Sequence, residues 1–182
     1  MPERYNVRIE GTRPLLMHSC NSMLEESNNK AARSKDHNPK TEAETALYKD
    51  KDGEIVVPSF SILSCLRGSA VNFQVPGKGK KTYKNFIYAG VKMEAGDVPL
   101  ISRNGWEIDL KTVVVQRSRI VRARPRFDEW ALEFVIEIVD PIITPDVLKQ
   151  IIEDAGKYNG LLDFRPLYGL FKLTSFEKVG TA

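Results

Sequence analysis

The 182-residue chain contains only two cysteines, Cys20 and Cys65, and two histidines, His18 and His37. It has no CxxC or HxxxH pair, so neither a zinc site nor a disulfide framework is indicated, and no cofactor is predicted. No apolar run approaches the roughly 20 residues that a membrane helix needs. Residues 1–5 lack the cationic start and apolar stretch of a secretory signal, so we expect a cytoplasmic protein with reduced thiols and no membrane partner.

Two segments of the chain lack acidic residues altogether. Residues 55–93 contain six basic residues and no Asp or Glu, and residues 111–127 contain another six. The other 126 residues carry 15 basic and 24 acidic side chains, a net charge of −9 that the overall charge of +3 conceals. A basic middle section suits a polyanionic ligand, because each phosphate that Lys or Arg neutralises releases counterions. The alternative is a solvated basic face that has no partner.

The hydrophobic pattern predicts an α+β fold of the ferredoxin-like or RRM-like type. The chain is long enough for one domain, 1–182, with a polar loop inserted at about 19–40 and a basic loop at about 75–84. Without these insertions the order of elements is β-α-β-β-α-β. Helices are expected at 41–48, 59–73 and 144–155, and strands at 5–11, 54–58, 86–93, 106–115, 129–139 and 170–176. Such a fold leaves one sheet face open, and many nucleic-acid binders use that face.

The two longer helices have recognisable ends. The first is expected to begin with Ser59 as N-cap and to bury the apolar stripe Phe60, Leu63, Leu66, Ala70 and Phe73. The second is expected to begin at the N-cap Thr144, with Pro145 in the first turn, and to stop at Gly156. In strand 106–115, the run of three valines at 113–115 is expected to be buried on both faces.

The strongest local signal for binding is an arginine row at 116–126. It contains Arg117, Arg119, Arg122, Arg124 and Arg126. Alternate residues of a strand share a side at a spacing of about 6.6 Å, which matches the phosphates of an extended single strand, and arginine binds phosphate through two hydrogen bonds. The alternative is that the arginines pair with the acidic surplus elsewhere, for example with Glu133 and Glu137.

A second signal is the loop at 76–84, which combines two glycines with Lys78, Lys80, Lys81 and Lys84. The P-loop spacing GxxxxGK[ST] is absent from it. The composition is typical of a clamp over a nucleic-acid backbone, with Tyr83, Phe86 or Tyr88 available to stack on bases. The alternative is an ordinary exposed loop.

A third segment, 160–169, precedes the last strand. Its glycines allow close approach of a backbone, and Arg165 is well placed to touch a phosphate. The alternative is a plain connector in which Asp163 and Arg165 form a local ion pair.

Signals for catalysis are weak. His18 and Cys20 are near neighbours, but two positions do not define a nucleophile and its base. Asp36, Asp50 and Asp52 are candidates for metal binding or in-line RNA cleavage, although the sequence at 50–53 is more typical of a hairpin turn.

Residues 52–67, DGEIVVPSFSILSCLR, resemble the stretch D-x-G-x-x-x-I-P-x-S-S-L-x-G-x-L-R of the RAMP superfamily, the RNA-binding backbone subunits of CRISPR effector complexes. Residues 165–171, RPLYGLF, are similar to the glycine-rich loop before that family's last strand. Two departures stand out. Cys65 replaces the usual glycine, and the C-terminal loop is poor in glycine.

The resemblance implies an RRM-like core that grips single-stranded RNA, with several copies side by side along the strand. Arg67, the lysines of loop 76–84 and Arg165 then correspond to the RNA-facing region. The loop at 19–40 corresponds to a thumb-like or catalytic region, in which an acidic residue of some relatives cleaves a paired target RNA. Asp36 is the one Asp in that loop and the candidate for this role.

The sequence thus favours a non-enzymatic, backbone-type subunit that binds single-stranded nucleic acid, in the first place RNA, with DNA as the open alternative. It is expected to oligomerise along its ligand or to join other effector-type subunits. Two alternatives stay open. One is a metal-dependent ribonuclease that uses Asp36 or Asp52, and the other is a phage interaction protein that mimics a CRISPR backbone subunit. The short chain also suits a solitary relative carried by a phage or mobile element, with a role in antiviral defence.

Overall fold

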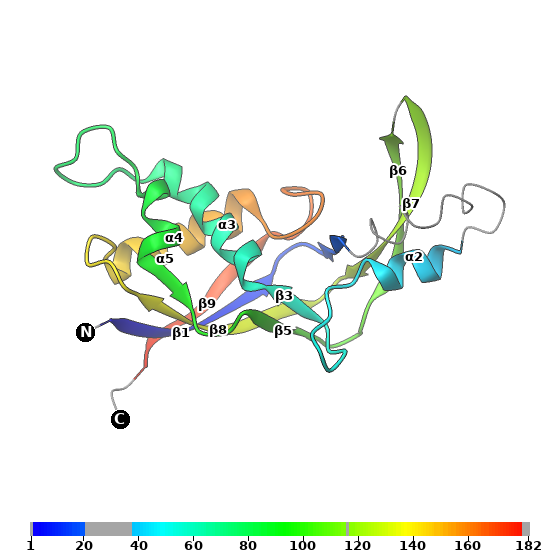
Figure 1. Cartoon of the computed structure of the whole chain (residues 1–182), viewed down its shortest axis with the longest axis horizontal. Helices are drawn as coiled ribbons and strands as arrows, with labels where there is room; N and C mark the ends of the chain where they lie inside the picture. The colour runs from blue at the N-terminus through cyan, green and yellow to red at the C-terminus, as the bar shows by residue number, and fades with distance from the viewer. Residues whose placement is uncertain (1, 21–37, 116, 180–182) are drawn as a thin grey trace.

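A computed structural model describes residues 2–20, 38–115 and 117–179. Within these ranges, two antiparallel sheets form the framework (Figure 1). The larger sheet contains β1 (Glu3–Gly11), β3 (Val56–Pro58), β4 (Val91–Met93), β5 (Asp97–Ser102), β8 (Trp130–Ile138) and β9 (Phe171–Lys178). The smaller sheet contains β2 (Leu15–Leu16), β6 (Glu107–Val115) and β7 (Ser118–Phe127). Most of the polar loop expected at 19–40 lies outside the described residues.

The helical segments are α2 (Pro39–Thr45), α3 (Ser59–Ser69), η2 (Ala70–Asn72), η3 (Tyr83–Asn85), α4 (Ile87–Gly90), α5 (Pro145–Asp154) and the π-helical η4 (Ala155–Asn159). Helices α3, α4 and α5 lie on one side of the larger sheet, which we call the helix side (Figure 1). The opposite, open face carries no helix within the described ranges. None of the described helices has the length and apolarity needed to span a membrane.

The central strands have the ferredoxin-like order. Strand β8 pairs with β1 on one side and with β4 and β5 on the other, and β1 also pairs with β9, always antiparallel. The chain runs from β1 through α3 to β4 and β5, then through β8 and α5 to β9. This is the β-α-β-β-α-β arrangement, so the expected α+β ferredoxin-like class is confirmed. The hairpin of β6 and β7 is inserted between β5 and β8 and projects from the sheet (Figure 1).

Helix α5 begins as the sequence predicts. The Thr144 side chain accepts a hydrogen bond of 3.4 Å from the Val147 backbone N–H, and Pro145 occupies the first turn. The prediction that Gly156 ends this helix is wrong, because the chain continues as η4 and turns only at Gly160, whose φ is +73°. A Cβ atom on Gly156 would lie 2.3 Å from the carbonyl oxygen of Phe171, so Gly156 lets β9 approach the helix.

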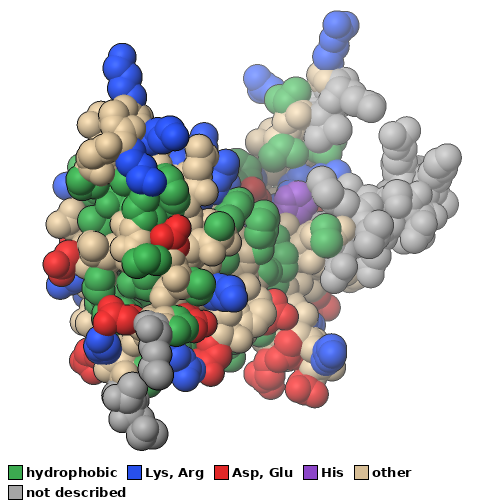
Figure 2. Space-filling view, turned by 60° about the vertical axis from the view of Figure 1, so that its left-hand side comes forward, with side chains coloured by type: hydrophobic (Ala, Val, Ile, Leu, Met, Phe, Trp, Pro, Cys, Tyr) green, Lys and Arg blue, Asp and Glu red, His purple; other side chains and the backbone are tan. Residues whose placement is uncertain are grey.

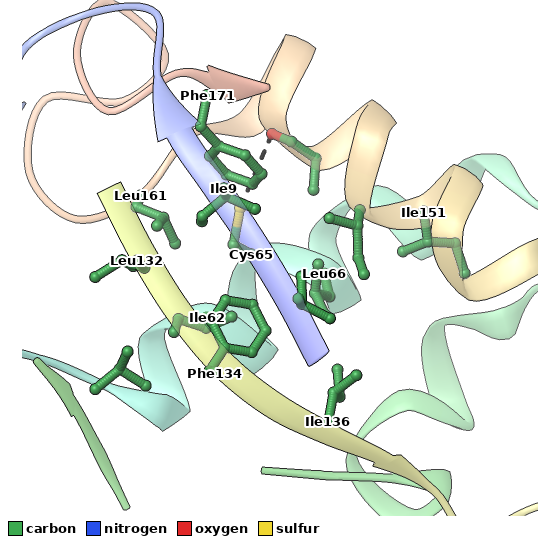
Figure 3. Packing of buried hydrophobic residues seen from close by; sticks show 14 of the residues in the cluster. Ile9, Ile62, Cys65, Leu66, Leu132, Phe134, Ile136, Ile151, Leu161 and Phe171 are labelled. Carbon is green, nitrogen blue, oxygen red and sulfur yellow. Dashed lines mark hydrogen bonds between the residues drawn. The ribbon is translucent and has the colours of Figure 1, made fainter. Parts of the chain in front are cut away.

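Helix α3 buries a different stripe from the predicted one. Its buried residues are Ile62, Cys65, Leu66 and Ser69, followed by Ala70. The side chains of Ile62, Cys65 and Leu66 lie close to β1 and β8 (Figure 3). Phe60, expected in the core, has 66% of its surface exposed. Ser59 is the first helical residue rather than the N-cap, which is Pro58. Positions three and four residues apart define two adjacent stripes on a helix, and packing selects the one without Phe60.

Two further predictions are wrong in detail. The strand expected at 86–93 begins as the short helix α4, and only Val91–Met93 is extended. Val114 is 69% exposed, so the valine run at 113–115 is not buried on both faces. The reason is its position on β6, at the edge of the projecting hairpin, where one face meets solvent. The strand expected at 129–139 is present as β8, with Leu132, Phe134 and Ile136 directed into the core (Figure 3).

Candidate nucleic-acid interface

The open face of the larger sheet carries matched charges of both signs. Arg8 on β1 contacts Glu133 on β8 and lies 3.3 Å from Glu10, which is 3.4 Å from Lys172 on β9. Arg4 contacts Glu94 at one end of the same face. Because carboxylates neutralise these cations, this face offers little attraction to a polyanion.

The exposed cations of two projecting segments have no carboxylate partner in the described part of the chain and lie on the helix side. Figure 2 shows Lys and Arg side chains at two raised ends of the molecule and a hollow between them. One end is the lysine loop, residues 75–82, and the other is the hairpin tip, residues 117–119, which both project on the helix side (Figure 1). Each of the two acid-free segments therefore contributes one end.

The backbone of the lysine loop is defined by short hydrogen bonds. The Val75 N–H donates to the carbonyl oxygen of Lys81 at 2.9 Å, and Gly77 and Gly79 supply the positive φ angles of +74° and +62° that its turns require. The side chains of Lys78, Lys80, Lys81 and Lys84 are exposed. The loop, together with Lys84 two residues beyond it in η3, thus presents four cations close together.

The aromatic residues near this loop differ in accessibility. Tyr83 is only 3% exposed, so the prediction that it is available for base stacking is wrong. Phe86 is half-buried, and the Lys78 ammonium lies 5.5 Å from its ring centroid. Tyr88 is 45% exposed.

The arginine row divides into two groups. Arg117 lies in the turn of the hairpin with a φ of +68°, not in a strand, and Arg119 follows as an exposed residue of β7. Arg122, Arg124 and Arg126 share a side of β7, as predicted, but that side faces carboxylates.

These carboxylates come from four different segments. Arg122 Nη1 lies 3.2 Å from Glu42 Oε1 on α2, and Arg124 Nε lies 3.2 Å from Asp163 Oδ2. Arg126 lies 2.6 Å from Asp128 and 3.8 Å from Asp109. The alternative of ion pairing therefore holds for these three arginines, although the partners are not Glu133 and Glu137.

The other eight cations that the sequence singled out have no carboxylate within 4 Å in the described part of the chain. They are Arg67, Lys78, Lys80, Lys81, Lys84, Arg117, Arg119 and Arg165. Their charge is available to an external anion.

A cleft of about 270 Å³ opens on the helix side. It is lined by His18, Tyr48, Phe60, Ser61, Ser64, Leu162, Asp163 and Arg165. These residues come from the start of α3, from the loop before β9 and from the segments next to β2 and β3. The sequence predicted neither this cleft nor that His18 and Phe60 would line it.

Hydrogen bonds fix the loop that supplies one wall of the cleft. Leu161 N–H donates to the Gly169 carbonyl at 2.9 Å, Gly169 N–H to Pro14 at 2.7 Å, and Asp163 N–H to Leu16 at 3.1 Å. A Cβ atom on Gly169 would lie 2.0 Å from the Leu161 carbonyl oxygen, so only glycine fits there. Asp163 pairs with Arg124 rather than with Arg165, which leaves Arg165 exposed at the rim.

The inner end of the cleft is polar. His18 Nδ1 lies 3.4 Å from Arg124 Nη2 and 4.0 Å from Asp163 Oδ2, and the Tyr48 hydroxyl donates to the His18 carbonyl at 3.0 Å. These contacts hold an imidazole and a carboxylate at the base of an otherwise aromatic and serine-lined wall.

The candidate catalytic aspartates receive no support as a metal site. Asp36 lies outside the described residues. Asp50 Oδ1 accepts hydrogen bonds of 2.9 Å from the N–H groups of Asp52 and Glu54, the geometry of an ordinary Asx turn. Within the described ranges, no group of three or more His, Cys, Asp and Glu side chains is arranged to hold a metal ion.

Among the comparisons with known proteins, only the one with solved structures gave a match, and it concerns the fold. No family model and no curated protein matches the sequence. Among 72 matching chains of solved structures is one from the cryo-EM structure of the Type III-B Cmr-beta bound to cognate target RNA. It is 14% identical to this chain, with a TM-score of 0.62, and the match covers all of this chain but 62% of the other. At this identity the likeness shows a shared α+β architecture.

Proposed function

We propose that this protein binds single-stranded RNA along the helix side of its sheet. The observation that carries this proposal is the arrangement of the exposed cations of the two acid-free segments. The lysine loop and the hairpin tip flank one cleft, and their lysines and arginines have no carboxylate partner in the described part of the chain. A raised basic rim on each side of a hollow suits a backbone that passes between them.

Three observations favour unpaired RNA as the ligand. Phe60 and Tyr88 expose aromatic rings beside the cleft, and such rings stack on bases that are free of a duplex. The resemblance of residues 52–67 to the RAMP stretch points in the same direction. The fold is also shared with a chain of the Type III-B Cmr-beta bound to cognate target RNA.

Assembly with further copies, or with other effector-type subunits, belongs to the same proposal. The β6–β7 hairpin exposes Leu110, Val114 and Val121, which are 56%, 69% and 54% exposed. Apolar side chains grouped on a projecting element suit contact with a second copy of this chain. Light scattering on RNAs of increasing length tests this part of the proposal, since the mass of the complex is expected to rise in steps of one protomer.

Roles in a CRISPR effector, on a phage or in antiviral defence remain predictions.

The binding proposal is tested by fluorescence anisotropy with labelled single-stranded RNA between about 50 and 200 mM salt. If about four cations neutralise phosphates, the logarithm of the affinity falls against the logarithm of the salt concentration with a slope of about −3. Duplex RNA and single-stranded DNA of the same sequence are expected to bind more weakly. A protein that merely mimics a backbone subunit would bind none of the three, and that result would overturn the proposal.

A further inference from the structure

The Phe60 side chain is exposed in a place where the sequence pattern predicts burial. In the described ranges, three aromatic side chains are largely exposed, and Phe60, at 66%, is the most exposed of them. It also lines the cleft. An exposed phenyl ring forgoes the favourable free energy of leaving water. A ligand that covers the ring would recover it.

Neighbouring side chains hold the ring in place from one side. The Tyr88 ring lies 5.9 Å from Phe60, centroid to centroid, with a tilt of 31° between the planes. Tyr88 is itself fixed by a hydrogen bond of 2.8 Å between its hydroxyl and Ser64, and by the Arg67 guanidinium 5.1 Å from its ring centroid. Phe60 is therefore backed by a fixed aromatic neighbour on α4, and it also borders the cleft.

The cleft has the size and chemistry for one small planar group. Its volume of about 270 Å³ is below the roughly 300–1,000 Å³ of pockets for drug-sized ligands, so it is too small for a run of nucleotides. Its wall combines the Phe60 ring with the hydroxyls of Ser61 and Ser64. His18 and Asp163 lie in the same lining. Hydrogen-bonding groups of this kind recognise the edges of unstacked bases.

Resting on the proposed function, we infer that the cleft holds a single unstacked base of the RNA, with its face against Phe60 and its edge toward Ser61, Ser64 and the polar inner end. Arg165, exposed at the rim without an ion pair in the described ranges, contacts the phosphate of the same nucleotide. The lysine loop and hairpin tip then hold the backbone on either side. The cleft thus adds a contact to the base itself, beyond the charge of the backbone.

The test compares two ligands of equal charge, a labelled oligo(A) and an abasic ribose-phosphate polymer of the same length. Phe60→Ala is expected to weaken binding of oligo(A) by about 5- to 150-fold, the range for loss of one base-stacking aromatic, and to leave binding of the abasic polymer unchanged. Tyr158→Ala is the matched control, because Tyr158 is also an exposed aromatic, at 56%, but does not line the cleft. Phe60→Trp is expected to retain binding of oligo(A).

The outcomes separate this inference from the proposed function. If the wild-type protein binds oligo(A) with a steep salt dependence but Phe60→Ala binds it equally well, the base site is wrong and backbone binding stands. If Phe60→Ala weakens both ligands equally, the ring has a structural role and the base site is again wrong. If the wild-type protein binds neither ligand, the proposed function fails and the base site fails with it.

Discussion

Arg124 shows how a single cation can belong to the fold rather than to the ligand. Its side chain is only 7% exposed and lies 3.2 Å from Asp163 and 3.8 Å from Glu42, whose side chain is 10% exposed. A buried guanidinium is tolerated when carboxylates compensate for its lost hydration. Here the ion pairs tie β7 to α2 and to the loop before β9, and so they support the base of the cleft.

Arg124 and Arg119 are therefore expected to respond in opposite ways to replacement by alanine. Arg124→Ala removes the cation beside Asp163, leaves Glu42 with Arg122 alone, and is expected to lower the free energy of unfolding by about 3 kcal/mol. Arg119→Ala, at an exposed position, is expected to change it by less than about 0.5 kcal/mol but to weaken RNA binding. Urea denaturation and anisotropy measure the two effects. Wild-type stability in Arg124→Ala would contradict the structural role given to this side chain.

Cys65 is another residue whose role is internal. Burial raises the pKa of its thiol from 9.0 to about 12, and the sulfur lies 3.0 Å from the carbonyl oxygen of Gly160. The Asn159 side chain in turn donates to the Cys65 carbonyl at 3.1 Å. The thiol thus helps to join α3 to the end of η4. The stretch of sequence that residues 52–67 resemble has glycine at this position.

The raised pKa of Cys65 predicts a loss of stability in alkaline solution. Above pH 9 the unfolded thiol loses its proton, whereas the folded thiol keeps its proton up to about pH 12, so the free energy of unfolding falls as the pH rises through this window. Tyr5, whose pKa burial raises from 10.0 to about 12, adds to the fall above pH 10. Denaturation of Cys65→Ala between about pH 8 and 10.5 is expected to show a shallower decline than the wild type. Parallel declines would refute this assignment.

At the scale of whole elements, predictability depended on how many independent signals agreed. Helix α5 has an N-cap, a proline in its first turn and one apolar stripe, and these all specify the same helix, so its start was predictable. Helix α3 has two adjacent stripes, and its expected N-cap, Ser59, is the first helical residue instead. The more apolar stripe included Phe60, which the folded protein exposes. Hydrophobicity alone did not distinguish the two stripes, because the one that packs depends on how the helix sits on the sheet.

The lysine loop is an element whose charge is expected to be separable from stability. Lys80→Gln combined with Lys81→Gln is expected to leave the melting temperature unchanged, since both side chains are exposed. The salt slope is expected to become shallower by about 0.7 for every phosphate that the variant no longer neutralises. Lys49→Gln with Lys51→Gln, which removes two exposed lysines outside the interface, is the control. A control that weakens binding as much as the loop variant would show that only net charge matters.

For the whole molecule, the sequence predicted that charge is segregated but not where the charges lie. The acid-free segments are visible in the sequence, and the confirmed ferredoxin-like order follows from periodicity. The sequence does not reveal that Arg122 and Arg124 point inward. Arg122, for example, meets Glu42, which is 80 positions away in the chain. Nor does the sequence show that the open sheet face, which many nucleic-acid binders use, carries matched charges here. Both facts depend on the folded arrangement.

The central claim, that RNA lies on the helix side, is tested most directly by two variants that each remove four positive charges. The helix-side variant carries Lys80→Gln, Lys81→Gln, Arg117→Gly and Arg119→Gln, with glycine chosen at 117 because φ there is +68°. The open-face variant carries Arg4→Gln, Arg8→Gln, Lys92→Gln and Lys172→Gln, because the strand register places these four side chains on the open face.

The measurement is the salt slope of single-stranded RNA binding for the wild type and both variants. We expect the slope of the helix-side variant to be shallower by about 3, with a matching fall in affinity, and the open-face variant to keep both wild-type values. An open-face variant that is weakened as much as the helix-side variant, or a helix-side variant that binds like the wild type, would contradict the account.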